Sequence, residues 1–420
     1  MKLLIVHQNM PGQYRELLAW LGEAIKAGAD HEVVFLTQRA KAPDFPCVTR
    51  VVYRAHHKAG NGSYGLSKAW EEATGAGFGA VSALKKYEEE TGFRPDLIIG
   101  HTGWGELLFV KQLWPDVPIL GFFEYFYRAA GGPVGFDPEE PTNEHSYYLL
   151  EARNAVPYAS LHKVDRLTAP TQWQANRFPD LFHDNLYVCH DGIRTDILRP
   201  KPDVSLSLGR LRAPLTRSDE VFTYVARNME TMRGFKTFMR ALPKILSARP
   251  HARALIVGGN EVSYGKDTST EGGFRAEMEA EVGHLIDWER VHFLGRVPYP
   301  RFIEIVQLSR CHIYLTMPFV LSWSLLEAMS MQATIVASDV EPVREAITHG
   351  ETGLLVDFFD TDALAEQVVD VLERPSQYVH LGRAARDHVV KVYDFKTVCL
   401  PRHVAEMNAL VPAQAGHLEI

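Results

Sequence analysis

The chain has 420 residues, of which 46% are hydrophobic, and its formal net charge is −8. Domains usually contain about 100–200 residues, so this length predicts two domains, and the acidic balance disfavours nucleic acid as a partner. The four cysteines are far apart and include no CxxC pair. This spacing argues against a disulfide framework or a zinc knuckle and favours a reducing, cytoplasmic environment.

Short apolar runs alternate with longer amphipathic segments in the first half of the chain. Strands are predicted at 3–6, 31–37, 95–101 and 117–123, and an amphipathic helix is predicted at 14–28. Strands and helices that alternate at this pitch are typical of parallel βαβ units. The first apolar run is too short for a signal peptide, and no stretch of about 18 apolar residues occurs, so we expect no membrane span.

A proline-containing segment at 199–220 interrupts this alternation and is predicted to be a linker, after which the alternation restarts. We therefore predict an α/β protein with two doubly wound domains that face a central cleft, because ligands of such folds bind at the carboxyl ends of the strands. The predicted domains are residues 1–200 and 201–395, followed by a carboxyl-terminal helix at 396–420 that returns to the first domain. The strands predicted in the second domain are 221–227, 252–259, 291–295, 311–316 and 333–339.

Gly12 lies in the turn between the first predicted strand and the first helix. A glycine at this place lets backbone amides approach a ligand, and the start of a helix favours an anion. The alternative is an ordinary turn glycine after Pro11. The dinucleotide fingerprint GxGxxG is absent from this turn, which disfavours a nicotinamide-dependent enzyme.

Two arginines follow the first strand of the predicted second domain. Arg227 ends the strand, and Arg233 precedes Gly234 at the start of a helix. Guanidinium groups at a strand end and a helix start suit a diphosphate, which binds bidentate donors. The alternative is that both arginines are solvated on the surface.

The stretch PFVLSWSLLEAMSM (318–331) leads from a serine-containing turn into an apolar helix. The backbone amides of Ser322, Trp323 and Ser324 are candidates for binding phosphate, and Glu327 is a candidate for accepting the hydroxyl hydrogens of a ribose. Ser324 and Glu327 also match the S-x-x-E capping box, so a structural role stays open beside the binding role.

Asp360 and Asp362 form a D-x-D pair of the kind that ligates Mg²⁺ or Mn²⁺. Both directly precede a predicted helix, where Asp is favoured as a cap, and we prefer the cap interpretation. The histidines show no HxxxH or HxH spacing. We therefore predict no metal centre.

Taken together, these segments resemble the retaining, nucleotide-sugar-dependent glycosyltransferases of family four, which have the GT-B fold. The resemblance extends over almost the whole chain and is greatest to a subset whose sequences begin with HQNxPGQ, as residues 7–13 do here. The other matching segments are APTQWQANRFP…CHDGIRTDILRP (169–200), VARNMETMRGF (225–235), VHFLGRVPY (291–299) and the stretch that begins at residue 318.

The resemblance implies donor-binding roles in the second domain. Arg227 and Arg233 match a phosphate-binding element in which Arg233 replaces a lysine. Arg296 and Val297 lie in a turn that resembles the one that binds the base. Glu327 takes the place of the second acid of an E-x₇-E pair, which clasps the ribose.

Three positions depart from the family's pattern. Phe319 replaces the first acid of the pair, which contacts the donor sugar, so we expect an apolar sugar pocket there. Glu124 stands where the family often has a histidine near the anomeric centre, and His101 matches a different family histidine at the end of the preceding strand. We treat Glu124 and His101 as catalytic candidates, and the alternative for Glu124 is a strand-end acid paired with Arg128.

The resemblance implies transfer of a sugar from a UDP-, GDP- or dTDP-linked donor to an acceptor, with retention of configuration and without metal or cofactor. The acceptor is expected to be a glycan, a lipid-linked molecule, a protein or a small molecule, and the loop 53–65 is its candidate docking segment. A location in the cytoplasm, with peripheral contact to the inner face of a membrane, is compatible with these expectations.

Three other classes stay open. A sugar-nucleotide epimerase with a similar fold is one, and a catalytically weak nucleotide-sugar-binding subunit is another, since Phe319 replaces an acid. The third is a metal-dependent, single-domain transferase that uses Asp360 and Asp362. The sequence does not indicate the oligomeric state, the base or the sugar.

Overall fold

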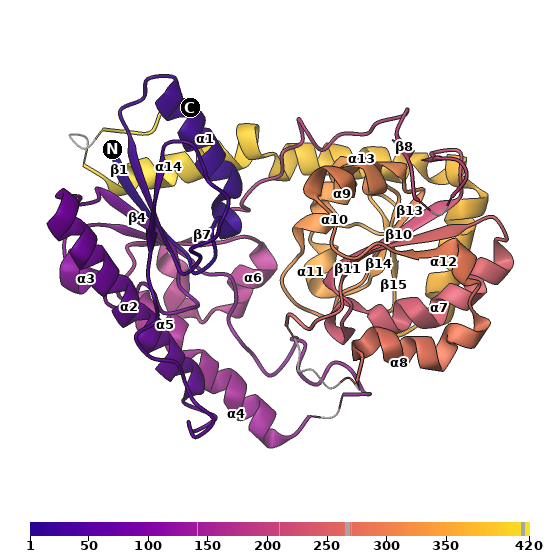
Figure 1. The fold of residues 1–420 in the computed structure, drawn as a ribbon, viewed down its shortest axis with the longest axis horizontal. Coiled ribbons are helices and arrows are strands. Elements are labelled where there is room, and N and C mark those ends of the chain that lie inside the picture. The colour runs from indigo at the N-terminus through magenta and orange to yellow at the C-terminus, as the bar shows by residue number, and fades with distance from the viewer. Residues whose placement is uncertain (141, 210, 265–268, 270, 413–415) are drawn as a thin grey trace. The chain divides into compact units, whose positions relative to one another are not determined.

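The computed structural model describes residues 1–140, 142–209, 211–264, 269, 271–412 and 416–420. The chain forms two compact units (Figure 1). The first unit contains Met1–Gly192 and Phe395–Ile420, and the second unit contains Ile193–Asp394. Each unit is an α/β structure built on one parallel sheet, which confirms the predicted fold class.

The first unit contains a seven-stranded parallel sheet in the order β3-β2-β1-β4-β5-β6-β7. Its central strands are buried along nearly their whole length, because helices cover both faces of a parallel sheet. That is why these strands appear in the sequence as short, continuous apolar runs. The strands are β1 (Lys2–Val6), β2 (Glu32–Thr37), β3 (Val48–Val52), β4 (Leu97–His101), β5 (Ile119–Phe122), β6 (Arg166–Ala169) and β7 (Leu186–Val188).

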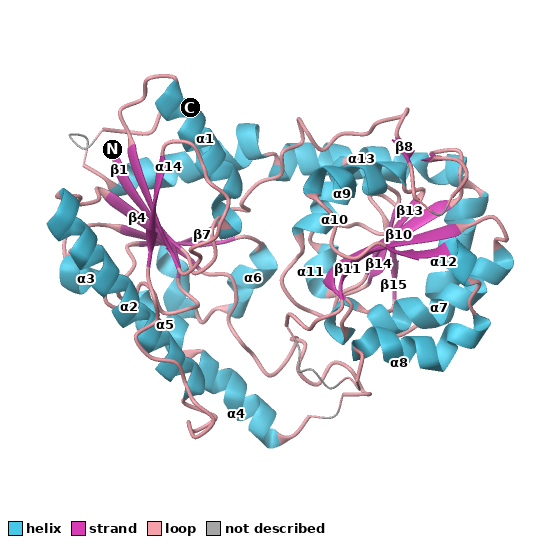
Figure 2. Cartoon of the chain, viewed as in Figure 1, coloured by secondary structure: helices cyan, strands magenta, loops and turns pink. Residues whose placement is uncertain are grey.

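The helices of the first unit cover two faces of this sheet, as Figure 2 shows in cyan. Leu18 and Leu21 of α1 share one core cluster with Val404 and Met407 of α14, so the carboxyl-terminal segment is packed into the first unit. Residues of α2 and α3 join the cluster on the other face. The helices are α1 (Arg15–Lys26), α2 (Lys68–Thr91), α3 (Val110–Leu113), α4 (Glu144–Arg153), α5 (Ala155–Leu161), α6 (Gln172–Arg177) and α14 (Leu400–Leu410), with the short helical turns η1 (Gly12–Tyr14), η2 (Asp180–Asn185) and η6 (Phe395–Cys399).

The second unit contains a six-stranded parallel sheet in the order β12-β11-β10-β13-β14-β15. Its strands are β10 (Val221–Asn228), β11 (Arg253–Gly259), β12 (Val291–Phe293), β13 (Cys311–Tyr314), β14 (Ile335–Ser338) and β15 (Leu354–Val356). Its helices are α7 (Phe235–Ala248), α8 (Gly273–Val282), α9 (Tyr299–Leu308), α10 (Trp323–Ser330), α11 (Glu341–Arg344), α12 (Thr361–Glu373) and α13 (Pro375–Tyr393), with the turns η3 (Thr231–Arg233), η4 (Gly283–Leu285) and η5 (Trp288–Arg290).

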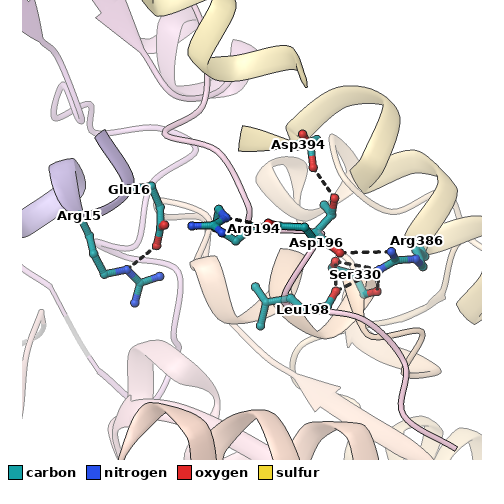
Figure 3. A network of polar contacts seen from close by, with 9 residues as sticks. Arg15, Glu16, Arg194, Asp196, Leu198, Ser330, Arg386 and Asp394 are labelled. Carbon is teal, nitrogen blue, oxygen red and sulfur yellow. Dashed lines mark hydrogen bonds and ion pairs between the residues drawn. The ribbon is translucent and has the colours of Figure 1, made fainter. Parts of the chain in front are cut away.

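The units divide after Gly192, whereas the sequence placed the division after residue 200. The segment that follows is held by the second unit: Arg386 Nη1 donates to the carbonyl oxygens of Leu198, at 3.0 Å, and Ser330, at 2.6 Å (Figure 3). Thr195 donates to Asp394 in the same unit. Proline content marks a loop, but these distant partners decide which unit the loop joins.

The predicted linker at 199–220 also contains a small hairpin. Strands β8 (Ser205–Leu206) and β9 (Leu215–Thr216) pair antiparallel, and Leu206 is buried in a cluster with Ile305 of α9. Val204, Leu206 and Leu215 of the segment predicted to connect two domains are therefore part of the second unit's own core.

Each sheet has one point where the strand order reverses. This switch point lies between β1 and β4 in the first unit and between β10 and β13 in the second. The loops that follow two such strands diverge to opposite faces of the sheet, so their residues line the crevice in which α/β folds bind ligands. Residues in the loops that follow β1, β4, β10 and β13 are therefore the ones placed to bind a ligand.

Candidate active site

The switch point of the first unit is occupied by two histidines. His7 follows β1 directly and is buried, and its ring meets the ring of His101 edge-on, with centroids 5.4 Å apart. Gly12 has a φ of +55°, and a Cβ at this position would lie 2.9 Å from the His7 ring. The histidine ring and the left-handed backbone therefore both require glycine here. The predicted contact of Gly12 with a donor stays a prediction.

His101 and Glu124, the two catalytic candidates, lie together. The Gly103 amide donates to His101 Nδ1 at 3.0 Å, so the neutral ring has its proton on Nε2. Nε2 lies 3.3 Å from Glu124 Oε2 and donates to it. The His101 ring is buried, whereas 34% of the Glu124 side chain is exposed. The histidine thus fixes the direction of a carboxylate that ligands can reach.

Arg128, the alternative partner of Glu124, has other roles. Its Nε donates to the carbonyl oxygen of Arg177 at 2.5 Å, and its Nη2 donates to that of Phe178 at 3.1 Å. These two hydrogen bonds use the Arg128 guanidinium to stabilise the loop after β5. This arrangement favours the interpretation of Glu124 as a site residue.

His7 was not among the residues singled out from the sequence. Burial and the neighbouring His101 lower the pKa of His7 to about 3, so the ring is neutral at physiological pH. Its position directly after the first strand was the available signal, because that place adjoins the switch point in this fold.

Arg233 is the central residue of the second unit's switch point. It ends η3, after β10, and its side chain is buried. Nη1 donates to Thr316 Oγ1 at 2.8 Å, in the segment after β13. Within the described residues Arg233 forms no ion pair. The buried Glu230 carboxylate interacts with Arg233 electrostatically but forms no ion pair with it, so an anionic ligand can still bind the guanidinium directly.

Phe319 belongs to the same cluster. The Arg233 guanidinium lies 5.1 Å from the ring centroid of Tyr264 and 6.0 Å from that of Phe319, and the two rings are 5.2 Å apart. The phenyl ring that replaces the family's acid therefore contacts the aromatic surroundings of a buried cation.

Glu230 positions part of this cluster and was missed by the sequence interpretation. It is buried, and Oε2 accepts the backbone N–H groups of Ser263, at 3.1 Å, and Tyr264, at 3.0 Å. The position of the Tyr264 ring over Arg233 thus depends on a carboxylate that is 34 residues away in sequence.

The other predicted donor-binding residues of this region differ in exposure. Arg227, in β10, is exposed, unlike Arg233. Arg296 Nη2 donates to Asn228 Oδ1 at 3.0 Å and to Glu261 Oε2 at 2.5 Å. Val297 is partly buried against the core under α9. The turn after β12 is thus tied to the end of β10, the strand that leads to Arg233.

The cap of α10 is Ser322, whose side chain accepts the N–H of Ser324. The capping box proposed for Ser324 and Glu327 is wrong, because Ser324 already lies inside the helix. The Ser322 amide donates to Tyr314 Oη at 3.0 Å. Since the amides of Ser322 and Ser324 already have acceptors, the predicted phosphate-binding role of this helix start has less support than Arg233.

Glu327 is buried in α10, beyond its first turn. The hydroxyl of Tyr299, the first residue of α9, donates to Glu327 Oε1 at 2.6 Å. The carboxylate is therefore held by a tertiary contact and does not cap its helix.

Asp360 caps α12, as the preferred interpretation predicts. Its Oδ1 accepts the N–H groups of Asp362, at 3.1 Å, and Ala363, at 2.8 Å. Asp362 instead pairs with Lys244. In the described parts of the chain, no group of three or more His, Cys, Asp or Glu residues is placed to hold a metal ion. No helix among the described residues is long and apolar enough to cross a membrane.

Two doubly wound parallel sheets, each with side chains gathered at its switch point, define the GT-B class of fold. Solved structures confirm this: sucrose-phosphate synthase from Thermosynechococcus elongatus superimposes with a TM-score of 0.71 at 19% identity, covering 97% of this chain and 98% of that one. The Anabaena protein Alr3699/HepE, solved in complex with UDP-glucose, does so with a TM-score of 0.65 at 16% identity, covering 97% and 98% of the two chains.

Two family models match the sequence. Residues 29–198 match the glycosyl transferase family 4 group, and residues 210–388 match the glycosyl transferases group 1. Together these matches support a GT-B glycosyltransferase of the family-four type. They do not test the narrower HQNxPGQ subset.

Two curated relatives align over 54% of this chain. The GDP-mannose-dependent monoacylated alpha-(1-6)-phosphatidylinositol monomannoside mannosyltransferase of Corynebacterium glutamicum is 26% identical over 239 residues. The D-inositol 3-phosphate glycosyltransferase of Thermobispora bispora is 25% identical over 246 residues. The alignments span 58% and 52% of the lengths of these relatives, which is about half of each.

Proposed function

We propose that the protein is a retaining glycosyltransferase that moves a sugar from a nucleoside-diphosphate sugar to a hydroxyl-bearing acceptor. The observation that carries the proposal is Arg233, a buried guanidinium at the switch point that forms no ion pair with a described residue. A diphosphate supplies a negative charge in direct contact and accepts hydrogen bonds from the bidentate donors of arginine. Arg227, exposed on β10, adds positive potential from the same segment.

The ribose of the donor is assigned to Glu327. Tyr299 donates to Oε1 and so fixes the carboxylate, which is the kind of acceptor that ribose hydroxyl hydrogens require. Arg296 and Val297 are assigned to the base. Solved structures of similar fold include complexes with UDP and UDP-glucose, and one curated relative is GDP-mannose-dependent, which supports UDP- and GDP-linked donors. A dTDP-linked donor rests on the family resemblance alone.

The chemical step breaks the bond between the anomeric carbon and the diphosphate oxygen and forms a bond from that carbon to the acceptor oxygen. The acceptor's proton passes to the leaving diphosphate on the same face of the sugar, so configuration is retained. The protein stabilises the departing charge through Arg233 and orients the reactants. Glu124, oriented by His101, stabilises positive charge at the anomeric carbon or binds the acceptor hydroxyl.

The positive charge in this scheme comes from arginines, so the reaction is proposed to need neither a metal ion nor a cofactor. We place the protein in the cytoplasm, with peripheral contact to the inner face of a membrane if its acceptor is a lipid. The curated relatives that act on phosphatidylinositol compounds make that contact a reasonable part of the proposal.

The test is a screen of nucleotide sugars by thermal shift, followed by turnover assays. A donor present at 100 times its Kd adds about 2.7 kcal/mol to the free energy of unfolding. Release of nucleoside diphosphate only with acceptor present, a product of unchanged anomeric configuration and full activity in EDTA are the expected results. An inverted product refutes retention, and loss of activity in EDTA refutes the metal-independent scheme.

A further inference from the structure

A cavity of about 720 Å³ lies within the first unit. It is lined by residues of the loops that follow β1, β2, β3 and β4 and by residues of α2, α4 and α5. It is therefore open at the carboxyl end of the sheet, which is the end where α/β folds bind ligands. Cavities of this size hold small polar molecules or the head of a larger one.

Glu106 is the residue that marks this cavity as a binding site. It lines the cavity and is 1% exposed. Tyr53 donates to Oε1 at 2.5 Å, whereas the buried Oε2 has no hydrogen-bond partner among the described residues. Burial raises the pKa of Glu106. A buried carboxyl oxygen without a partner is costly, and a ligand hydroxyl placed in the cavity removes that cost.

The cavity is also rich in cations. Lys58, Lys68 and Arg153 line it, and neither lysine forms an ion pair with a described residue. The Arg153 guanidinium lies 5.4 Å above the Tyr127 ring, which holds it in the wall. His57 also lines the cavity but pairs with Glu71 at 2.5 Å, and the exposed Glu72 is the second acid of the lining. The net charge of the wall favours an anion.

The cavity adjoins the candidate catalytic pair of the same unit. Trp104, which is 44% exposed, lines the cavity and stacks on the His101 ring, with centroids 5.5 Å apart. His101 in turn contacts Glu124. The exposed indole face suits the C–H face of a sugar or polyol ring, and a ring stacked there lies next to the residues assigned to the anomeric centre.

We propose that this cavity binds the acceptor and that the acceptor is a polyol or sugar that carries a phosphate group. Lys58, Lys68 and Arg153 bind the phosphate, Trp104 supports the ring, and Glu106 binds a hydroxyl group that is not glycosylated. The term acceptor rests on the proposed transfer reaction, but the binding of the phosphorylated polyol itself requires no donor. A free polyol phosphate and the headgroup of a phospholipid share this chemistry.

The test measures binding to the full chain without donor. The free probes are myo-inositol 1-phosphate, myo-inositol and inorganic phosphate, and the lipid probes are phosphatidylcholine vesicles with and without phosphatidylinositol. We expect the phosphorylated polyol, free or as the lipid headgroup, to bind at least tenfold more tightly than either of its two parts, with an affinity that falls as salt rises. Binding of the free probe or of the phosphatidylinositol vesicles identifies which of the two sources supplies the phosphorylated polyol.

The variants separate the two kinds of contact. Lys58→Gln combined with Lys68→Gln is expected to weaken binding of the phosphorylated polyol at least tenfold, because charge-assisted contacts are lost. Glu106→Gln is expected to weaken it while leaving the weak binding of inorganic phosphate unchanged. Lys85→Gln is the matched control, since Lys85 lies on α2, as Lys68 does, but is exposed outside the cavity, and it is expected to bind like the wild type.

Nucleoside-diphosphate binding, measured on every variant, reports folding of the second unit and keeps the two proposals apart. Failure of the wild type to bind any nucleoside diphosphate refutes the proposed function and leaves the cavity test intact. The cavity proposal is overturned if diphosphate binding is normal and any one of three results is found. These results are equal affinity for inositol and its phosphate, no binding of either the free or the lipid probes, and unchanged binding in the double lysine variant.

Discussion

The hydroxyl of Tyr299 donates a hydrogen bond to Glu327 Oε1 at 2.6 Å, which joins the start of α9 to a buried carboxylate of α10. Because Ser322 caps α10, Glu327 can be changed without loss of the cap. Glu327→Gln keeps the shape and loses the charge. We expect a melting temperature close to that of the wild type and nucleotide binding weakened by about 1.5–3 kcal/mol, measured by calorimetry.

Asp360→Ala is the control for that variant, since Asp360 is a true helix cap. It is expected to lower the free energy of unfolding by about 0.5–2 kcal/mol and to leave nucleotide binding unchanged. Strong destabilisation by Glu327→Gln with intact nucleotide binding contradicts the ribose assignment.

Arg233 should be more important for the diphosphate than the exposed Arg227. Arg233→Gln is expected to weaken binding of nucleoside diphosphate by about 1.5–3 kcal/mol, or roughly 10- to 150-fold, whereas Arg233→Lys retains most of it, since the charge remains. Arg227→Ala should have a smaller effect, because solvent screens exposed charge. Arg240→Gln, which removes a partly exposed ion pair between Arg240 on α7 and Glu281 on α8, serves as the control. Unchanged affinity in both Arg233 variants removes this residue from the site.

Glu124→Gln tests the carboxylate that His101 orients. Glutamine still accepts the hydrogen bond from His101 Nε2, so the geometry is kept while the charge is lost. We expect turnover to fall by about 10²–10³-fold with donor binding largely intact, measured by single-turnover rates and a donor titration. Wild-type turnover in this variant shows that Glu124 is not beside the reacting atoms.

Phe319 is expected to select the donor sugar. A phenyl ring cannot accept a hydrogen bond from a sugar hydroxyl, and an unpaired buried hydroxyl costs about 1–3 kcal/mol. We therefore expect preference for a donor with a less polar face, such as a 6-deoxyhexose, in competition between donors that share the nucleotide and differ by one hydroxyl. Phe319→Leu, an apolar control, should keep the preference. A strong preference of the wild type for the fully hydroxylated hexose refutes the proposed role of Phe319 in selecting the donor sugar.

His312 predicts a loss of stability in mild acid. It is fully buried in β13, with Nδ1 2.7 Å from Thr223 Oγ1, and burial lowers its pKa to about 4. In the unfolded chain this histidine has a pKa of about 6.5. Between about pH 6.5 and pH 4 the unfolded state therefore binds a proton that the native state does not bind, so stability falls as pH falls below about 6.5. Between pH 7 and pH 5 this histidine should cost about 2 kcal/mol.

The measurement is urea unfolding of the wild type and of His312→Asn at pH 7 and pH 5. The variant has a lower stability at both values, but its loss between them should be smaller by about 2 kcal/mol, because asparagine does not titrate. Equal losses in the two proteins contradict the buried, neutral state of His312.

Local sequence patterns predicted the strands at the centre of each parallel sheet but not β3, β6, β7 and β15. Each βα unit has its own apolar run and amphipathic helix within a few tens of residues, so 3–6 and 95–101 could be recognised as buried strands before their neighbours were known. The cap at Asp360 was predictable for the same reason, since a cap is a contact between residues two or three apart. The place of Arg233 at a strand's carboxyl end followed from that alternation.

The contacts that make the candidate site were decided by the tertiary structure. His101 and Glu124 meet because β4 and β5 are adjacent parallel strands, and Tyr53 reaches Glu106 from the end of another strand. Such pairs depend on strand order and register, which the local periodicity of either segment does not encode. The same reason explains why Ser324 and Glu327, matched as a local capping box, form no such box: the tertiary contact from Tyr299 binds the carboxylate instead.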